Sequence, residues 1–330
     1  MPLLACAAAE IGFGFARAKR PKVESVVVAG HDEYQTSGSI SVREPIPNAW
    51  KTKRRVVDGE VEFEATYHFD SHGRRTTPVP RSADPVKASL FFGGSRVLGS
   101  GVDDHETLPA EFARHRPGTR AYNYGFHGYG PSQALDILRR RDLREEIPEE
   151  VELAIYFLTG ADLTRVIGSM RVSAGRCRRC ANFELEESGE LVRAGDFSTG
   201  RPLRTIAYSL LDRSNVLKFL RIDLPMQMTD EHRQRTVAVI RAVRDELVRI
   251  FPNAEFAVVI GPGNEGIRAM KPLIESADLL AVDYYDLYDS GDLRMRISRS
   301  NTHPSARAYR LIAERLAADF DAGFGRGRQP

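Results

Sequence analysis

From Lys87 onward, short apolar runs alternate with segments whose apolar residues recur every three or four positions. The runs have the length of buried strands, and the spacing in the other segments is that of amphipathic helices. This alternation is typical of a parallel sheet covered by helices. The predicted strands are 88–92, 121–123, 153–158, 256–260 and 279–282.

Two helices are predicted most clearly. The segment 230–251 carries apolar residues at helical spacing, and Thr229 or Asp230 can cap its N-terminus. The last helix is predicted at 305–320. Between 172 and 214 the periodicity is lost among Gly, Ser and charged residues, so we interpret this stretch as an insertion near one end of the sheet.

The first 85 residues follow a different pattern. Short β-like runs stand at 23–29 and 61–69, and the second alternates apolar with more polar residues, as a half-buried strand does. We therefore predict two parts. Residues 1–85 form an N-terminal extension that starts with a short apolar segment and is then β-rich, and residues 86–330 form the α/β domain.

The start of the chain leaves its compartment open. Residues 1–16 are apolar apart from Glu10, but they lack a basic n-region and are too short to cross a bilayer, which takes about 20 residues. Cys6 follows a Leu-Leu-Ala that loosely suggests a lipoprotein processing site, with only five residues before it. The segment is either a shortened anchor for export or membrane association, or a simple N-terminal helix of a cytoplasmic protein.

Composition narrows the class of protein. With 330 residues, 42% of them hydrophobic, the chain is long enough for a substantial core. The 47 Lys and Arg residues nearly balance 45 Asp and Glu residues, and this net charge of +2 argues against a nucleic-acid partner. Three cysteines cannot form a disulfide framework for a chain of this length.

The strand at 88–92 is followed by Gly93, Gly94 and Ser95. At the carboxyl end of a parallel strand, a serine hydroxyl faces the crevice in which ligands bind, and the glycines let a substrate approach the backbone. This motif differs from the nucleophile elbow of the α/β-hydrolases, because Val97 stands where that motif requires glycine. Ser95 is therefore either a nucleophile on another scaffold or the N-cap of a tight turn.

A histidine precedes the terminal helix. His303 stands in a pre-helical loop within Asn301-Thr302-His303-Pro304, from which it can reach a serine at the end of the first sheet strand and act as its general base. The alternative is a histidine on the surface or at the helix cap.

Three blocks in this order resemble the SGNH, or GDSL-type, hydrolases. The first, 90–109, contains the Gly-Gly-Ser and continues into Gly-x-Gly-Val-x-Asp-x-Glu-Thr. The second is Asn-Tyr-Gly-Phe-His-Gly-Tyr-Gly at 123–130, and the third, 303–314, opens the last helix with His-Pro. The resemblance implies a three-layer α/β/α, flavodoxin-like fold with a parallel sheet. It also implies a serine esterase or acyltransferase that acts on an acyl ester, of a carbohydrate or a lipid.

The resemblance also implies roles for individual residues. Ser95 would be the nucleophile, His303 its base, and the backbone amides of Ser95 and Gly128 the donors of the oxyanion hole. This chemistry requires no metal and no organic cofactor. The implied partner is a small-molecule or glycan ester, and the oligomeric state is left open.

Three departures from the family pattern bear on activity. Gly94 replaces the aspartate beside the nucleophile, and Ala161 or Asp162 stands near the position of an asparagine that normally donates to the oxyanion hole. The triad aspartate is also missing, although Asn301 can still orient the imidazole through its amide oxygen. The chain is thus either a hydrolase with altered support or a catalytically impaired protein on the same fold that binds a glycan or an envelope partner.

Other motifs compete with this interpretation. Residues 261–266 read Gly-x-Gly-x-x-Gly after a strand, as in dinucleotide-binding proteins, but too few residues follow for the sheet that such a fold requires. Cys177 and Cys180 have the spacing of half a zinc site without a second half, so a local disulfide or two free thiols is expected.

Further candidates could line a substrate site. His127, beside Gly128, and Asp162 are possible substrate contacts, and His127 is also an alternative acid or base. Asp283 and Asp286, interleaved with tyrosines, are either the rim of a sugar-binding site or an ordinary strand end.

Overall fold

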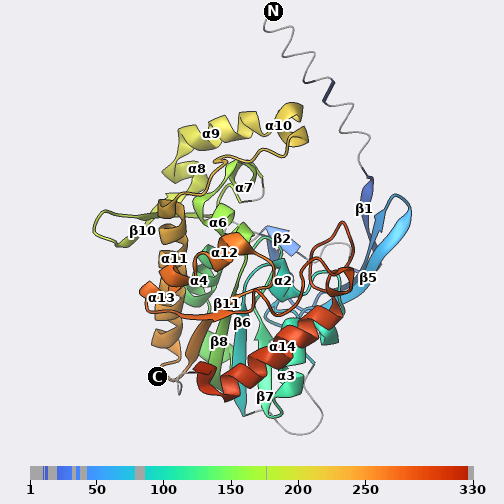
Figure 1. The fold of residues 1–330 in the computed structure, drawn as a ribbon, viewed down its shortest axis with the longest axis vertical. Helices are drawn as coiled ribbons and strands as arrows, with labels where there is room; N and C mark the ends of the chain where they lie inside the picture. Colours follow the sequence, from blue (N-terminus) through green and yellow to red (C-terminus); the bar gives the residue numbers. More distant parts are fainter. Residues whose placement is uncertain are drawn as a thin grey trace, which may run out of the picture.

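A five-stranded parallel sheet forms the centre of the computed structural model (Figure 1). The structure describes residues 10, 12–13, 21–31, 35–37, 43–78, 86–175 and 177–325. The central strands are β6 (Lys87–Phe92), β7 (Thr119–Asn123), β8 (Glu150–Leu158), β11 (Glu255–Ile260) and β12 (Leu280–Asp283). All five were predicted from their apolar runs; the structure extends four of them by one to three residues and shifts the last, predicted at 279–282, by one residue.

The strand order of this sheet is β12-β11-β8-β6-β7. Numbered along the chain, this is the flavodoxin-like order 2-1-3-4-5, so the predicted fold class is confirmed. The chain steps from β6 to β7 on one side and then returns to β8 on the other side of β6. Ligands bind outside the carboxyl ends of the strands at such a switch point.

Both faces of the sheet are covered by helices. Along β6, Leu90 and Phe92 belong to one buried cluster and Phe91 to the other, as alternating side chains on a strand must. The first face is covered by α4 (Pro131–Arg140) and α11 (Asp230–Ile250). The second is covered by α3 (Leu108–His115) and α14 (Ala306–Asp321), which completes the three layers (Figure 1).

Short helices lie mostly between these elements. Thr229 caps α11 and Ser305 caps α14, each through its side-chain oxygen, within a residue of the predicted starts. Outside residues 170–219, the described chain also contains the helices α2 (Ser95–Leu98), α5 (Leu143–Glu146), α6 (Gly160–Ile167), α12 (Glu265–Arg268) and α13 (Lys271–Ser276), with 3-10 turns at Asp104–Glu106, Leu293–Met295 and Gly323–Gly325.

The N-terminal region contains five β-strands among its described residues. Strands β1 (Val23–Gly30), β4 (Trp50–Val57) and β5 (Glu60–His68) form an antiparallel sheet in the order β1-β4-β5. Two short strands, β2 (Gln35–Ser37) and β3 (Arg43–Pro45), pair beside it.

Arg75 ties this region to the α/β domain. Its buried guanidinium pairs with Asp104 at 2.8 Å and donates to the carbonyls of Leu98, Gly99 and Val102. These carbonyls belong to the segment that follows Ser95. Because one rigid guanidinium donates both to this segment and to the carbonyl of Thr66 on β5, the N-terminal strands are fixed against the first block of the sheet domain.

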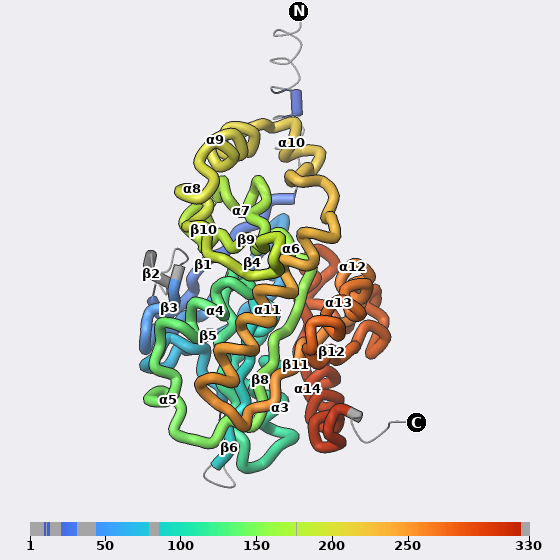
Figure 2. The backbone as a smooth tube through the Cα atoms, turned by 90° about the vertical axis from the view of Figure 1, so that its left-hand side faces the viewer, coloured from blue at the N-terminus to red at the C-terminus, as the bar shows by residue number. Residues whose placement is uncertain are grey.

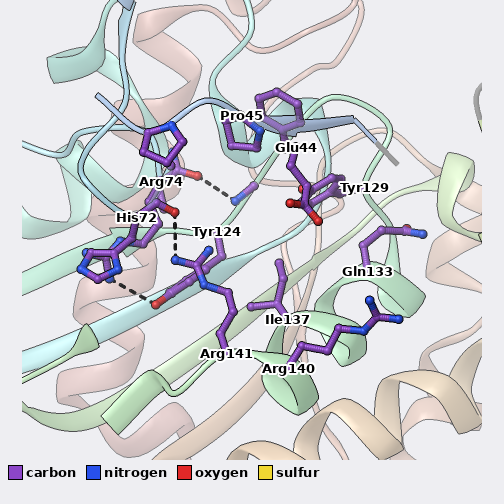
Figure 3. Close-up of a pocket in the computed structure, with 15 residues that line it drawn as sticks. Glu44, Pro45, His72, Arg74, Tyr124, Tyr129, Gln133, Ile137, Arg140 and Arg141 are labelled. Atoms are coloured by element: carbon purple, nitrogen blue, oxygen red, sulfur yellow. Dashed lines mark hydrogen bonds between the residues drawn. The ribbon is translucent and has the colours of Figure 1, made fainter. Parts of the chain in front are cut away.

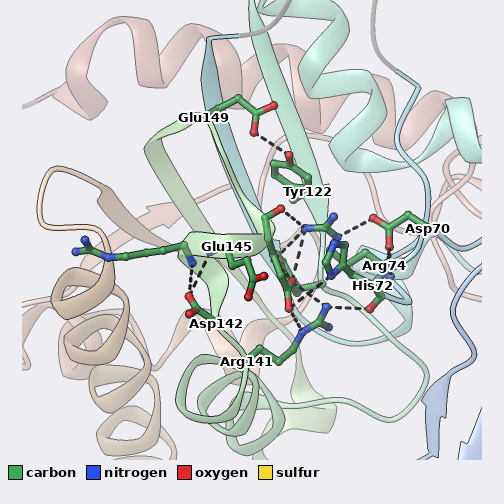
Figure 4. Close-up of polar contacts among 11 residues, drawn as sticks. Asp70, His72, Arg74, Tyr122, Arg141, Asp142, Glu145 and Glu149 are labelled. Carbon is green, nitrogen blue, oxygen red and sulfur yellow. Dashed lines mark hydrogen bonds and ion pairs between the residues drawn. The ribbon is translucent and has the colours of Figure 1, made fainter.

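Arg74 forms a second connection. It pairs with Asp70 at 2.7 Å and donates to the hydroxyl of Tyr124 at 3.2 Å, while Arg141 pairs with Glu146 at 2.6 Å in the same network (Figure 4). Because these charges are already paired, the network is best described as a structural contact between the two regions.

The predicted insertion lies beyond the carboxyl ends of the sheet strands (Figures 1 and 2). It contains α7 (Met170–Ala174), a hairpin of β9 (Ala181–Leu185) and β10 (Leu191–Asp196), and the helices α8 (Phe197–Gly200) and α9 (Pro202–Leu211), followed by α10 (Asn215–Phe219). Cys177 and Cys180 form a local disulfide, one of the two expected states.

Most of the apolar start, 1–16, lies outside the described residues. Where it is described, Glu10 accepts hydrogen bonds from Ser214 and Asn215, and the ring of Phe13 lies 4.8 Å from that of Phe219. Within the described part of the chain, no helix combines the length and apolarity that a bilayer crossing requires.

Candidate active site

Ser95 lies at the switch point of the sheet. It directly follows the turn after β6 and is the first residue of α2, with Gly94 before it. Its side chain is half-buried and opens onto a cleft at the carboxyl ends of the strands. This is the location that the Gly-Gly-Ser motif predicted for a nucleophile.

His303 reaches Ser95 from the far end of the chain. Its Nε2 lies 2.8 Å from the Oγ of Ser95, although 208 positions separate the two residues. The loop before α14 holds the histidine, and Tyr309 of that helix donates from its hydroxyl to the carbonyl of Arg96, next to the serine. The predicted meeting of a hydroxyl and an imidazole is therefore present.

Asn301 fixes the orientation of the ring. Its Oδ1 lies 2.7 Å from the Nδ1 of His303 and also accepts from the backbone N–H of that histidine. Because an amide oxygen can only accept, Nδ1 carries the proton and Nε2 keeps its lone pair toward Ser95. This tautomer is the one that a general base requires.

Glu62 completes the arrangement and was not among the predicted site residues. It lies on β5, and its Oε2 accepts from the Nδ2 of Asn301 at 3.3 Å. Only 3% of its side chain is exposed, and Arg55 pairs with it at 2.5 Å. Since the carboxylate receives the NH₂ group of Asn301, the amide oxygen must face His303.

The loop before His303 holds Glu62 in its charged form. Burial alone would raise the pKa of this carboxyl, but hydrogen bonds from Ser298 and Ser300 and the charge of Arg55 outweigh it, so the pKa is lowered. A negative charge thus stands behind the histidine, one amide further away than a directly bonded aspartate would be.

His303 itself is held neutral. Burial, followed by the charges of Arg96, Arg55 and Arg165, lowers its pKa to about 4, and Glu62 opposes them. A neutral imidazole is able to accept a proton over nearly the whole physiological range.

The cleft in front of this pair has a volume of about 440 Å³. Loops after β6, β8 and β11 form its walls, together with the loop before α14. Its polar lining includes Ser95, Arg96, Arg165, Asn264, Tyr288, Ser290, Arg296, Thr302 and His303.

The structure explains why glycine replaces the aspartate at position 94. A Cβ atom on Gly94 would lie 2.9 Å from the carbonyl oxygen of Tyr129 and 2.8 Å from Nη1 of Arg165. Arg165 donates to that same carbonyl at 2.7 Å and pairs with Asp162. The space beside the nucleophile that a side chain would need is thus occupied by a backbone group and a guanidinium.

Asp162 is turned away from the cleft. Its side chain is fully buried in the first turn of α6, where it accepts from Arg165 and from the N–H and hydroxyl of Thr159, the N-cap of that helix. Burial raises its pKa. Asp162 is therefore absent from the lining of the cleft, whereas the sequence analysis named it as a candidate substrate contact.

Asn264 brings another amide to the cleft wall. It lies in the loop after β11, where its Oδ1 accepts from the N–H of Ile267, and its Nδ2 lies beside Gly160 in the third strand-to-helix turn of the sheet. The sequence marked this residue only as part of the Gly-rich run at 261–266, and its place on the cleft wall was not predicted. The Gly-rich run that resembles a dinucleotide motif thus contributes a wall of the cleft, with the four-residue α12 behind it.

The second block lies beside the nucleophile turn. The N–H of Phe126 donates to the carbonyl of Gly93 at 3.4 Å, and Gly128 follows in an exposed turn with a φ of +82°. A Cβ at position 128 would meet no atom within 4 Å, so the turn leaves open space there. Nearby, the Nδ1 of His127 lies 3.3 Å from Oγ of Ser100, and burial lowers the pKa of this histidine to about 3.

The remaining candidates have structural partners. Asp283 and Asp286 both pair with Arg268, at 3.4 and 3.0 Å, and neither lines the cleft beside Ser95. Tyr288, from the same run, does line the cleft. Among the residues that the structure describes, no cluster of His, Cys, Asp or Glu has the arrangement of a metal site.

Comparisons with known proteins find similarity only at the level of solved structures. No family model matches the chain, and no curated protein matches it in sequence. A family two carbohydrate esterase from Clostridium thermocellum, in complex with cellohexaose, matches with a TM-score of 0.43 and 12% identity, over 85% of this chain and 83% of that one.

Two further similar structures are also those of esterases. An acetyl xylan esterase, Est2A, from Butyrivibrio proteoclasticus has a TM-score of 0.39 and 12% identity, over 86% of this chain and 81% of that one. AlinE4, an SGNH-hydrolase family esterase, has a TM-score of 0.37 and 19% identity, over 75% of this chain and 100% of that one. Identities this low say nothing of the substrate, so the chemistry follows from the site alone. The chain is similar to esterases of the SGNH type, the family that its three sequence blocks resemble.

Proposed function

We propose that the protein is a serine esterase or acyltransferase in which Ser95 is the nucleophile and His303 the general base. The observation that carries this proposal is the 2.8 Å contact between Ser95 Oγ and His303 Nε2, with Asn301 fixing the tautomer. A serine becomes nucleophilic when a neighbouring base can take its proton during attack.

The reaction has two balanced steps. Ser95 Oγ attacks the acyl carbon while its proton passes to His303 Nε2, and the alcohol of the ester then leaves with that proton. In the second step, water or a sugar hydroxyl gives its proton to Nε2 and attacks the acyl-enzyme, and Ser95 Oγ leaves and recovers the proton. The backbone N–H groups of Ser95 and Gly128 would stabilise the oxyanion.

Two other residues of the chain take the place of the triad aspartate that it lacks. Asn301 and the buried, ionised Glu62 stand where an aspartate would normally support the histidine. We propose that the negative charge acts through the amide, which orients the ring and favours the imidazolium that forms during attack. The ester of a carbohydrate or a lipid remains the substrate class that the family resemblance suggests.

A fluorophosphonate probe tests the proposal directly. Labelling should occur in the wild type, disappear in Ser95→Ala and persist in Ser100→Ala, whose hydroxyl lies beside His127 instead. Labelling that depended on Ser100, or that survived in Ser95→Ala, would contradict the assignment. Absence of labelling in folded protein would favour the alternative, a binding protein on the same fold.

Hydrolysis of short 4-nitrophenyl esters gives the second test. His303→Ala should lose activity by a factor on the order of a hundred to ten thousand, the contribution of a general base. Full activity in this variant would show that another residue is the base, and His127 would be the next to test.

A further inference from the structure

The active-site cleft contains an excess of positive charge. Three arginines line it, Arg96, Arg165 and Arg296. Of the described residues that form its lining, none is an aspartate or a glutamate. A hydrolase acting on neutral esters has no need of such charge, and the partners of each arginine show where the charge is balanced and where it is not.

Arg165 is accounted for by the fold. It pairs with the buried Asp162 at 3.0 Å and donates to the carbonyl of Tyr129. The buried carboxylate of Asp162 therefore balances the charge of Arg165. Through the carbonyl of Tyr129, Arg165 holds the second block against the start of α6.

Arg96 and Arg296 are different. Neither forms an ion pair with a carboxylate in the part of the chain that the structure describes; the Nε of Arg296 donates to the carbonyl of Ser290. Both side chains are half-buried and line the cleft together with Tyr288. Burial raises the pKa of Tyr288, and the positive charges of the two arginines oppose that rise. The two guanidinium groups thus stand near one tyrosine on the wall of the cleft.

A second cavity offers a comparison. It has a volume of about 380 Å³ and also contains arginines, including Arg74 and Arg141 (Figure 3). There, however, Arg74 pairs with Asp70 and Arg141 with Glu146. Many arginines of this protein thus pair with acidic side chains. The two arginines in the cleft beside Ser95 that do not pair in this way therefore point to an anion supplied by the ligand.

We propose that the substrate is an ester carrying an anionic group, a carboxylate or another oxyanion, that binds between Arg96 and Arg296 beside Tyr288. This inference rests on the proposed esterase function. Guanidinium groups bind planar oxyanions through paired, charge-assisted hydrogen bonds, and a half-buried site strengthens them. The anion would occupy the cleft at the same time as the acyl group reaches Ser95.

Such a substrate would also act on the base. Arg96, Arg55 and Arg165 all lower the pKa of His303, and Glu62 is the charged group that raises it. An anion bound to Arg96 would offset part of the effect by which Arg96 lowers the pKa of His303. The imidazolium that forms during attack would then be more favourable with an anionic ester than with a neutral one.

The test compares matched esters. In the first set the charge is on the alcohol side: 4-acetoxybenzoate and 4-acetoxybenzenesulfonate are compared with the neutral methyl 4-acetoxybenzoate. In the second set the charge is on the acyl side: 4-nitrophenyl hemisuccinate is compared with the neutral 4-nitrophenyl butyrate. After correction for hydrolysis by hydroxide, kcat/KM should favour at least one anionic ester. Arg96→Gln or Arg296→Gln should reduce that preference about 10- to 100-fold, as expected for lost charge-assisted hydrogen bonds.

Arg294→Gln is the matched control. Arg294 lies on the same loop as Arg296, is largely exposed and pairs with Asp292, so its loss should leave the preference intact. If wild type shows no preference for any anionic ester, or if the preference is unchanged in both cleft variants, the inference is wrong while the esterase assignment stands. Preference should also decline with added salt, because screening weakens the pairing.

A binding measurement separates the two proposals. Calorimetry with Ser95→Ala compares 4-acetamidobenzoate with methyl 4-acetamidobenzoate, which are not esters at the acetyl group. Tighter binding of the anion that is lost in Ser95→Ala/Arg96→Gln supports the anion site even if no hydrolysis is found. Equal binding of both compounds, or anion binding that does not depend on Arg96, would overturn it.

Discussion

Asn301 Nδ2 donates to Glu62 Oε2 at 3.3 Å, across 239 positions of the chain. Through this contact a residue of the N-terminal sheet determines which atom of the amide faces His303, and hence which ring nitrogen carries the proton. The N-terminal strands thereby belong to the machinery that we propose for catalysis.

Replacement of Glu62 by glutamine should reduce kcat about 10- to 100-fold. The carboxylate is removed and the neutral amide can also donate, so Asn301 is no longer held in one orientation. Steady-state kinetics with a 4-nitrophenyl ester measures the effect. Glu64→Gln is the matched control, since Glu64 lies on the same strand but is exposed and pairs with Arg54; equal losses in the two variants would mean that Glu62 acts only through stability.

Asn301→Asp should be rescued by Glu62→Gln. The single substitution at 301 places two carboxylates side by side, which repel each other and leave one of them protonated. In the double variant, the introduced carboxylate can accept from His303 and also receive the NH₂ group of the introduced amide. We therefore expect kcat of the double variant to exceed that of either single variant. If the two losses simply multiply, the two side chains do not act as one unit.

The acid limit of activity should lie near pH 4. His303 must be neutral to accept a proton, and its pKa is lowered from 6.5 to about 4 by burial and by Arg96, Arg55 and Arg165, against Glu62. Activity should thus be retained as pH falls through 6 and be lost as pH passes below about 4. A profile of kcat/KM against pH measures this, with circular dichroism at each pH, and an acid limb near 6.5 would contradict the lowered pKa of His303.

The same shift affects stability. An unfolded chain binds a proton at His303 below about pH 6.5, whereas the folded protein does not until about pH 4, so this group destabilises the fold progressively as pH falls between those values. Arg96→Gln should raise the pKa of His303 and reduce this loss. Denaturant unfolding at pH 7 and pH 5 for both proteins checks the direction; a larger loss in the variant would be the opposite of what we expect.

Gly94→Asp, which restores the family's Gly-Asp-Ser, should destabilise the protein by about 1 to 3 kcal/mol, because the side chain would be forced against Tyr129 O and Arg165. Thermal unfolding measures the loss. Gly266→Ala is the control, since its Cβ would meet only Asn264 Oδ1 at 3.7 Å. A stable, active Gly94→Asp would mean that Arg165 moves freely to pair with the new carboxylate.

The apolar runs and the helical periodicity were sufficient to predict the sheet and its covering. Burial on both faces requires continuous apolar runs, and the strands β6, β8 and β11 have them, so the fold class was readable from local pattern. The proximity of Ser95 and His303 was likewise predictable, because a motif after the first sheet strand and one before the last helix converge in such a topology.

Glu62 was not predictable. It is one of three acidic residues, with Glu60 and Glu64, that alternate along β5, and all three look alike in the sequence. Only the packing of β5 against the loop before α14 buries one of them beside Asn301 and leaves Glu64 exposed. Burial and long-range pairing depend on which surfaces meet in three dimensions.

The sequence by itself determined the layers of the fold, the serine at the strand end and the histidine before the closing helix, because these follow from periodicity and order along the chain. Tertiary structure decided which carboxylate supports the histidine, why glycine stands beside the nucleophile, and which arginines of the cleft remain unmatched. These depend on contacts between residues far apart in the chain, and local patterns do not encode them.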